Sequence, residues 1–114
     1  MMGMFGFTKS SRLLSRNQFE HVYTNGATFH RGPIRIHMVE NMLEHNRLGL
    51  SVPRRAGNAV RRNRIKRLLR EAFRLIPDPP VQGYDLVVTV RQHAPFSTEH
   101  YQSLLTEALA KTCR

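Results

Sequence analysis

The sequence predicts an α/β sandwich in which helices pack on one sheet. Apolar residues recur at helical spacing in three segments, and they alternate with polar residues in three other segments. These segments follow the order helix, two strands, helix, strand, helix. A length of 114 residues allows one hydrophobic core but not two. We therefore expect one domain over residues 1–114, with an N-terminal segment at 1–14 and a folded core at 15–110.

Three helices are expected from their capping residues and their apolar spacing. The first begins at a capping box formed by Ser15 and Gln18, and it ends at Asn25, before a glycine that tolerates a left-handed turn. The second runs over 58–76, from an asparagine cap to the residue before a proline. The third is capped by Ser97 and carries an apolar stripe, namely Tyr101, Leu104, Leu105, Ala108 and Leu109.

Three strands are expected from alternation with a period of two residues. They cover 29–39, 47–52 and 84–91, and a polar turn at 41–46 separates the first two. We expect the first two strands to form an antiparallel pair. The face that points away from the core then carries small or polar residues and cations, namely Arg35, His37, Gly49, Ser51, Thr89 and Arg91.

The net charge of +10 and the pI near 11.3 indicate a polyanionic partner, because so much like charge repels itself in a compact state. No apolar run approaches the ~18–20 residues of a spanning helix, and the N-terminus does not resemble a signal peptide. The single cysteine, Cys113, cannot form an internal disulfide, and the six histidines lack zinc-ligand spacing. We expect a cytoplasmic protein with no membrane partner and no protein-bound metal.

Half of the positive charge lies between residues 54 and 74, where nine of the 18 basic residues accompany one acid, Glu71. On a helical wheel an apolar stripe opposes a basic side. The stripe consists of Ile65, Leu68, Leu69, Ala72 and Ile76, with Phe73 at its edge. The spacing allows one i, i+4 ion pair, between Arg67 and Glu71. Val60 falls on the basic side, so the first turn is expected to be irregular or to pack under the preceding loop.

The same region carries a recognisable motif. Residues 47–52 (RLGLSV), followed by 54–74 (RRAGNAVRRNRIKRLLREAFR), closely resemble the signature of the bacterial ribonuclease P protein subunit, including its RNR tripeptide at 62–64. The resemblance extends through 5–10 (FGFTKS), Phe19, Tyr23 and 84–88 (YDLVV), and it covers most of residues 5–109.

The resemblance implies a protein cofactor that assembles with a catalytic RNA and promotes endonucleolytic removal of the 5′ leader from precursor tRNA. The RNA carries the chemistry with Mg²⁺, and the protein is a monomer, one per RNA. The residues agree, because we find no paired carboxylates, activated nucleophile or metal cluster that could cleave a phosphodiester. The family fold has a small mixed sheet, three helices and a left-handed crossover between parallel strands, against the usual rule.

The resemblance also assigns two surfaces. Contact with the catalytic RNA is expected from Arg54, Arg55, Asn58, Arg61, Arg62, Asn63, Arg64, Lys66, Arg67 and Arg70. A cleft for the leader is expected from Phe7, Lys9, Arg12, Phe19, Tyr23, Arg35, His37 and Arg91. In this cleft bases would stack on aromatic rings and phosphates would meet arginines. Plain core packing is the alternative for Phe19 and Tyr23, and His37 replaces an aromatic residue expected in some relatives.

Two other classes of protein remain as alternatives. A ribosomal or double-stranded-RNA-binding structural protein would explain the charge and the basic helix, but not the polar sheet face or the signature. A DNA-binding regulator would need a short helix and a tight turn directly before its recognition helix, and residues 47–57 do not predict them.

Overall fold

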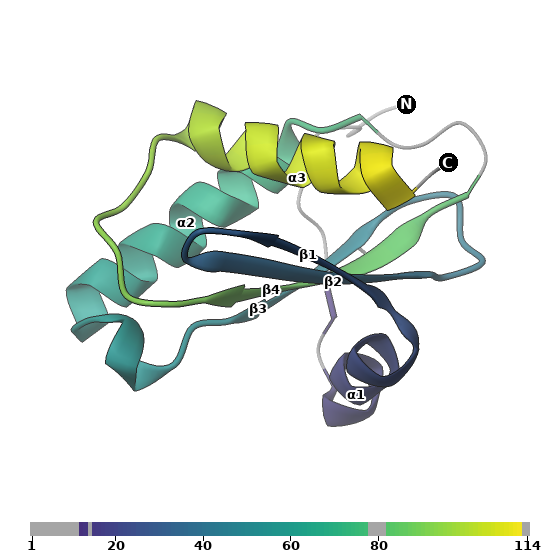
Figure 1. Ribbon diagram of the computed structural model, residues 1–114, viewed down its shortest axis with the longest axis horizontal. Coiled ribbons are helices and arrows are strands. Elements are labelled where there is room, and N and C mark those ends of the chain that lie inside the picture. The colour runs from purple at the N-terminus through teal and green to yellow at the C-terminus, as the bar shows by residue number, and fades with distance from the viewer. Residues whose placement is uncertain (1–11, 14, 78–81, 113–114) are drawn as a thin grey trace.

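The computed structural model describes residues 12, 13, 15–77 and 82–112, which form one mixed sheet and three α-helices (Figure 1). In chain order the elements are α1 (Arg16–Asn25), β1 (Ala27–Arg31), β2 (Ile34–Glu40), β3 (Arg47–Ser51), the 3₁₀ turn η2 (Arg54–Ala56), α2 (Ala59–Arg74), β4 (Tyr84–Val90) and α3 (Thr98–Thr112). Helices α2 and α3 cover one face of the sheet, and α1 lies against the other. The α+β fold class and the three helices are confirmed.

Strand pairing differs from the prediction. The sheet order is β1-β2-β4-β3, in which β4 is antiparallel to β2 and parallel to β3. The expected antiparallel pairing of the strands at 29–39 and 47–52 is therefore wrong, because β4 lies between them. Nearly all of β4 is buried on both faces. A central position removes the most apolar surface from water, so it is most favourable for the most apolar strand. The parallel crossover through α2 is confirmed, whereas its left hand stays a prediction.

The expected single strand at 29–39 is a hairpin of β1 and β2. The chain turns at Gly32, whose φ of 55° is left-handed, and Pro33 follows directly. Residues before and after the turn pair antiparallel, so that Phe29 faces Ile36 on the core side. Phe29 is the one buried residue of β1, and the buried positions change phase between it and Ile34, so the short β1 shows no alternation of its own that could have marked it as a separate strand.

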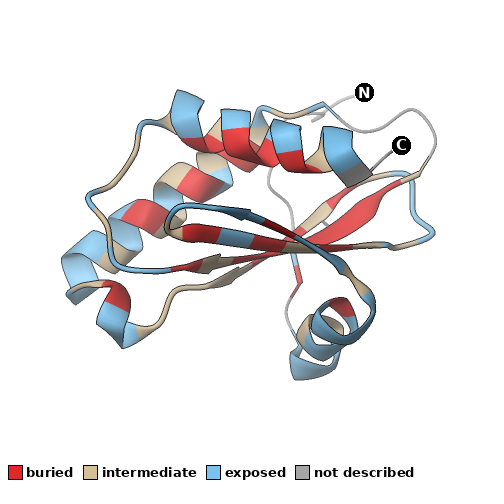
Figure 2. Ribbon diagram, viewed as in Figure 1, coloured by how far each residue is buried: buried red, intermediate tan, exposed pale blue. Residues whose placement is uncertain are grey.

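The main core lies between the sheet and the helices α2 and α3 (Figure 2). Ile65, Leu69 and Ala72 of the expected stripe are buried, and Leu68 and Ile76 pack partly buried against them. Phe73 is buried rather than at the edge of the stripe. The stripe of α3 also faces this core: Tyr101, Leu104, Leu105 and Ala108 are buried and Leu109 is partly buried.

Helix boundaries follow the expected caps, with one difference in mechanism. Ser15 and Gln18 form the capping box, and the side chains of Asn58 and Ser97 accept backbone N–H groups of α2 and α3. Gly26 ends α1 in an extended conformation, with φ −89°, and not in the expected left-handed one. Glycine is needed there because a Cβ would lie 2.5 Å from the Met38 carbonyl oxygen.

A buried ion pair joins the start of β3 to the start of β4. Arg47 donates from Nε and from one terminal nitrogen to the two carboxylate oxygens of Asp85, both at 2.7 Å. Asn41 adds a third donor to Asp85, at 2.9 Å, and Asn46 accepts the Tyr84 N–H at 2.8 Å. The hydrogen bonds to Asp85 raise the pKa of Arg47, and they join the directly paired residues Arg47 and Asp85 of the two parallel strands.

Candidate nucleic-acid interface

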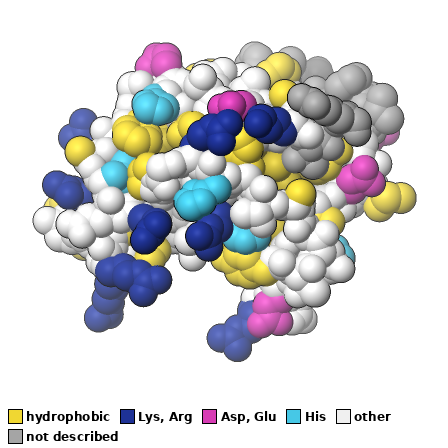
Figure 3. Space-filling view, in the orientation of Figure 1, with side chains coloured by type: hydrophobic (Ala, Val, Ile, Leu, Met, Phe, Trp, Pro, Cys, Tyr) yellow, Lys and Arg dark blue, Asp and Glu magenta, His cyan; other side chains and the backbone are white. Residues whose placement is uncertain are grey.

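Helix α2 presents the densest group of exposed cations. Arg61, Arg64, Arg67 and Arg70 are exposed, whereas Arg62 and Lys66 are half-buried. Asn63, Arg67, Arg70 and Arg74 line a shallow cavity of about 480 Å³ with Glu71. Such a row of guanidinium groups suits bidentate contacts with phosphates. Figure 3 shows further cations in dark blue at the lower left, the end of the molecule where α2 begins.

The single acid of this region pairs with a different arginine from the one expected. Glu71 accepts two hydrogen bonds from Arg74, three residues later, including one at 3.1 Å from Arg74 Nε. The Arg74 side chain lowers the pKa of Glu71 through these bonds. Glu71 therefore pairs with Arg74 and not with Arg67 as expected from the i, i+4 spacing. Arg67 stays exposed on the basic side.

The first turn of α2 is regular, so the expectation for Val60 is wrong. Asn58 caps this turn by accepting the Arg61 N–H at 2.8 Å, and Arg62 donates from Nε to the Gly57 carbonyl at 3.1 Å. Val60 is 78% exposed among these cations instead of packing under the preceding loop. The capping bonds fix the start of the helix, and the position of Val60 on the helix then places its side chain on the exposed basic side.

The sheet face opposite α2 and α3 forms the floor of the expected leader cleft. Two rows cross it: His37 lies beside Val87, which lies beside Gly49, and Arg35, Thr89 and Ser51 form the next row. Helix α1 covers part of this floor through a second, small core of Leu13, Val22 and Val87. The predicted polar face is therefore present, but Val87 and Gly49 are buried beneath α1.

The two aromatic residues of α1 have different environments. Phe19 packs half-buried against the small core, and a Cβ at Gly49 would lie only 2.6 Å from its Cζ. Tyr23 is 41% exposed and meets the His37 ring edge-on, with ring centroids 4.9 Å apart. Phe19 thus has a packing role, while Tyr23 is available for stacking.

Two cavities join residues that the sequence assigned to separate surfaces. One, of about 180 Å³, lies at the edge of β3 and brings Lys66 and Arg70 of α2 beside Arg12 and Phe19. The other, of about 340 Å³, brings Arg55 of η2 beside Thr89 and Arg91 at the end of β4. The i, i+4 spacing of Lys66 and Arg70 was visible in the sequence. Their proximity to Phe19 depends on the position of β3 at the edge of the sheet, and the sequence did not reveal that position.

The N-terminal part of the cleft is only partly described. Arg12 forms a parallel bridge with Leu48, and Leu13 donates its N–H to the Leu48 carbonyl at 3.0 Å. This segment therefore borders the outer edge of β3. Phe7, Lys9 and Cys113 lie outside the described residues, as do the first eleven positions as a whole.

Among the expected cleft residues, His37 has a pKa that its surroundings shift from the ordinary value. Burial lowers its pKa, and the nearby Arg35 guanidinium lowers it further. Its Nδ1 is the only side-chain nitrogen or oxygen in the described part of the chain that is buried without a hydrogen-bond partner. Both effects favour the neutral form of the imidazole on this face of the sheet.

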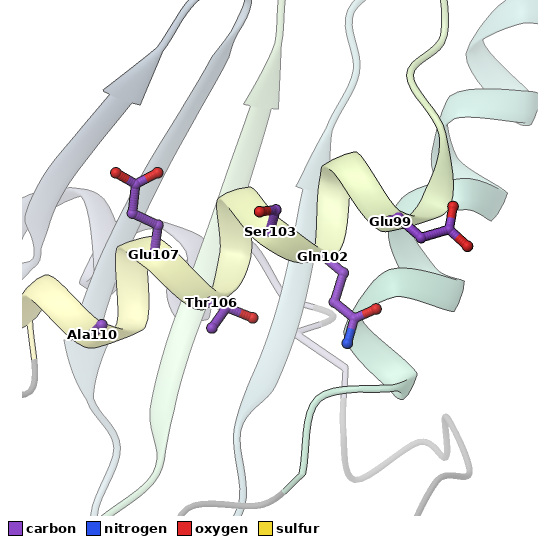
Figure 4. A pocket seen from close by; sticks show the side chains of 6 residues that line it. All are labelled: Glu99, Gln102, Ser103, Thr106, Glu107 and Ala110. Atoms are coloured by element: carbon purple, nitrogen blue, oxygen red, sulfur yellow. The ribbon is translucent and has the colours of Figure 1, made fainter.

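The outer face of α3 has the opposite character. Glu99, Gln102, Ser103, Thr106 and Glu107 surround a shallow depression there (Figure 4). Glu107 accepts a hydrogen bond from Arg31 at 3.0 Å. This acidic and neutral lining does not suit phosphates, in contrast to the exposed arginines of α2 and η2.

Residues 12, 13, 15–77 and 82–112 contain neither a cluster of metal ligands nor a membrane-spanning helix. No three His, Cys, Asp or Glu side chains in these ranges gather closely enough to hold a metal ion. Within the same ranges no helix has the length and the apolar character needed to cross a membrane.

Comparisons with known proteins agree with the fold and the motif. The family model described as Ribonuclease P matches residues 7–113. The ribonuclease P protein component of Natranaerobius thermophilus is 44% identical over 77 residues, covering 68% of this chain and 67% of the relative. That of Desulfosudis oleivorans is 40% identical over 93 residues, covering 82% and 77%.

Solved structures show the same similarity in three dimensions. A Staphylococcus aureus RNase P protein mutant with defective mRNA degradation activity superposes with a TM-score of 0.77 at 31% identity, covering 91% of this chain and 89% of that one. The RNase P protein from Thermotoga maritima gives a TM-score of 0.72 at 28% identity, covering 88% and 96%. With the matched motif, the fold and the relatives in agreement, this chain belongs to the family of bacterial ribonuclease P protein components.

Proposed function

We propose that this chain binds the catalytic RNA of ribonuclease P and the 5′ leader of precursor tRNA, and so promotes removal of the leader. The observation that carries the proposal is a pair of cavities on α2 that share Arg70 as a lining residue. One is lined by further arginines of the helix, and the other reaches Arg12 and Phe19 at the edge of β3. A catalytic RNA and a single-stranded leader that meet on one small protein need such adjoining sites.

Each surface suits one kind of RNA. The exposed arginines of α2 and η2 offer phosphate contacts without sequence readout, which suits a folded RNA. The cleft combines Tyr23, His37 and Arg35 and suits unstacked bases and a flexible backbone. Lys66 and Arg70 line the junction between the two surfaces, so we assign them to both RNAs.

The hydrolytic chemistry is assigned to the RNA subunit. We place Mg²⁺ at the RNA active site, as the family resemblance implies, and assign no metal to the protein side chains. The protein's part is electrostatic: its cations replace counterions where two RNAs approach each other. One protein monomer per RNA, in the cytoplasm, completes the proposal.

The direct test is a cleavage assay with three samples: protein alone, catalytic RNA alone, and the two together. We expect RNA-free protein to leave precursor tRNA intact, and the mixture to cleave at lower Mg²⁺ and lower salt than the RNA alone. Cleavage by the pure protein would overturn the assignment of the chemistry to RNA. Equal Mg²⁺ requirements with and without protein would favour a structural RNA-binding protein instead.

A further inference from the structure

A tyrosine of α3 contacts the connection between β4 and α3, which comprises residues 91–97 (Figure 1). The Tyr101 side chain is fully buried, and its hydroxyl oxygen lies 2.7 Å from Nε2 of His93. The other ring nitrogen of His93, Nδ1, lies 2.8 Å from the carbonyl oxygen of Arg91, the residue directly after β4. Two hydrogen bonds therefore join α3 to the end of β4 through one imidazole.

The direction of each bond follows from the chemistry of its partners. A carbonyl oxygen can only accept, so Nδ1 of His93 carries a proton and donates it to Arg91. In the neutral ring Nε2 is then the acceptor, and the Tyr101 hydroxyl donates to it. Burial raises the pKa of Tyr101 above its ordinary value of 10, so the hydroxyl keeps the proton that it donates. The same hydroxyl accepts the Phe96 N–H at 3.2 Å, so it is satisfied both as donor and as acceptor.

The backbone of Arg91 is held from two sides. Its N–H donates to the Pro33 carbonyl at 2.9 Å, which joins it to the turn between β1 and β2. Its carbonyl accepts from His93, which joins it to α3. Within the described residues the Arg91 guanidinium forms no hydrogen bond or ion pair, so the backbone bonds fix the point from which a free cation extends.

The side chain of Arg91 lines the cavity of about 340 Å³ at the end of β4, together with Arg55 and Thr89. A guanidinium there can donate to a phosphate oxygen that enters the cavity. An arginine loses rotamer freedom when it binds, and a fixed backbone limits how far its guanidinium moves before binding. The bonds to the Arg91 backbone therefore lower the entropic cost of placing this cation beside a phosphate.

We propose that Tyr101 and His93 are positioning residues for Arg91: from α3, on the face of the sheet opposite α1, they hold the end of β4 and with it a cation for a leader phosphate. The inference rests on the proposed function, in which Arg91 belongs to the leader cleft, and it adds the two residues that place this cation. In the alternative, the same bonds stabilise the connection but have no effect on RNA binding.

The test uses the complete holoenzyme, assembled with the catalytic RNA, and compares its affinities for precursor and mature tRNA. Tyr101→Phe removes the hydroxyl but keeps the ring that fills the core. His93→Leu leaves the bond between Tyr101 and Phe96 intact and removes only the branch that leads to Arg91. We expect each variant to weaken precursor binding by about 2- to 5-fold, less than Arg91→Ala at about 10-fold, and mature tRNA binding to stay unchanged.

A double-mutant cycle provides a readout that a purely structural role would not move. In the Arg91→Ala background the cation is absent, so Tyr101→Phe should cause no further loss of precursor affinity. Its effect on the melting temperature should persist in that background, because the bonds of the Tyr101 hydroxyl do not involve the Arg91 side chain. Additive losses of precursor affinity would contradict the positioning role.

Two further variants serve as a rescue and a control. His93→Asn keeps an amide N–H close to the position of Nδ1, so it should bind precursor tRNA more tightly than His93→Leu. Equal affinities of these two variants would contradict the bond to the Arg91 carbonyl as the link. Tyr84→Phe makes the same chemical change in a buried tyrosine at the other end of β4, and it should leave the ratio of precursor to mature tRNA affinity unchanged.

Failure of this inference is distinct from failure of the proposed function. If Arg91→Ala weakens precursor binding while Tyr101→Phe and His93→Leu do not, the two bonds are only structural and the leader function stands. If Arg91→Ala leaves precursor affinity unchanged, the leader contact fails and the inference fails with it. Should Tyr101→Phe not fold, His93→Leu tests the same link at a half-buried residue.

Discussion

At the scale of single residues, one helical turn separates Phe19 from Tyr23, yet their side chains have different tasks. Phe19 fills the space above Gly49, which a Cβ would obstruct, and it completes the small core under α1. Tyr23 leaves much of its ring exposed beside His37. The sequence could pair the two residues by spacing, but it could not show which ring the neighbouring strand would cover.

Alanine substitutions should separate these tasks. Phe→Ala in a core costs ~3–5 kcal/mol, and for the half-buried Phe19 we expect a loss of about 2 kcal/mol in the free energy of unfolding. Tyr23→Ala should change that free energy by less than ~0.5 kcal/mol but should remove base stacking worth ~1–3 kcal/mol. Urea unfolding of the protein and the ratio of precursor to mature tRNA affinity in the holoenzyme measure the two effects. A large loss of stability in Tyr23→Ala would make that residue part of the core.

His37 also makes stability depend on pH. Its pKa in the folded protein lies below the ordinary value of 6.5, so the unfolded chain takes up this proton first as acid is added. The stability that the neutral ring contributes is complete above pH 6.5 and is lost as the pH falls through the folded-state pKa. We expect the free energy of unfolding to fall less steeply below pH 6.5 in His37→Phe than in the wild type. Parallel curves for the two proteins would contradict the lowered pKa.

At the scale of elements, capping residues close to each helix determine where it starts, whereas the strand order of the sheet depends on residues far apart in the sequence. Ser15, Asn58 and Ser97 each cap a helix within a few residues of the predicted start, because capping bonds form between sequence neighbours. The position of β4 between β2 and β3 depends on pairing across dozens of residues, which no local pattern encodes. The basic side of α2 could therefore be predicted, whereas its junction with the cleft could not.

The buried pair of Arg47 and Asp85 holds the parallel strands in register. Arg47→Met leaves the Asp85 carboxylate buried without its main partner, and breaking such a pair costs ~3–5 kcal/mol. Since Arg47 keeps some contact with solvent, we expect about 3 kcal/mol, measured by urea unfolding. The double variant Arg47→Met with Asp85→Leu removes both charges and should recover much of this loss. A double variant no more stable than Arg47→Met would contradict the cost assigned to the unpaired Asp85 carboxylate.

At the scale of the whole molecule, the charge is distributed unevenly. Arginines dominate α2 and η2, whereas the outer face of α3 carries Glu99 and Glu107. A polyanion therefore approaches from a preferred side, and the resulting complex releases counterions in proportion to the number of phosphates it contacts. The net charge predicted the type of partner, and only the fold shows the side on which the partner lies.

Salt dependence tests this distribution. With ~6–10 phosphates neutralised, affinity for the catalytic RNA should fall by roughly 10³–10⁵ between about 50 and 200 mM monovalent salt. Arg64→Ala combined with Arg67→Ala should reduce the slope of log affinity against log salt by about 2, since each phosphate contact contributes about 1. Arg31→Ala with Lys111→Ala removes the same charge near α3 and should leave the slope unchanged. Equal slopes in both double variants would indicate a diffuse effect of net charge.

The central place of β4 also determines when this protein can acquire its structure. Strands β2 and β3 follow each other in the sequence but do not pair with each other, because β4, which begins at Tyr84, lies between them in the sheet. During synthesis the first three strands leave the ribosome with one hairpin and an open edge, and the sheet closes only after β4 emerges. The basic helix α2 is synthesised before β4, so its arginines are exposed to RNA before the domain has folded.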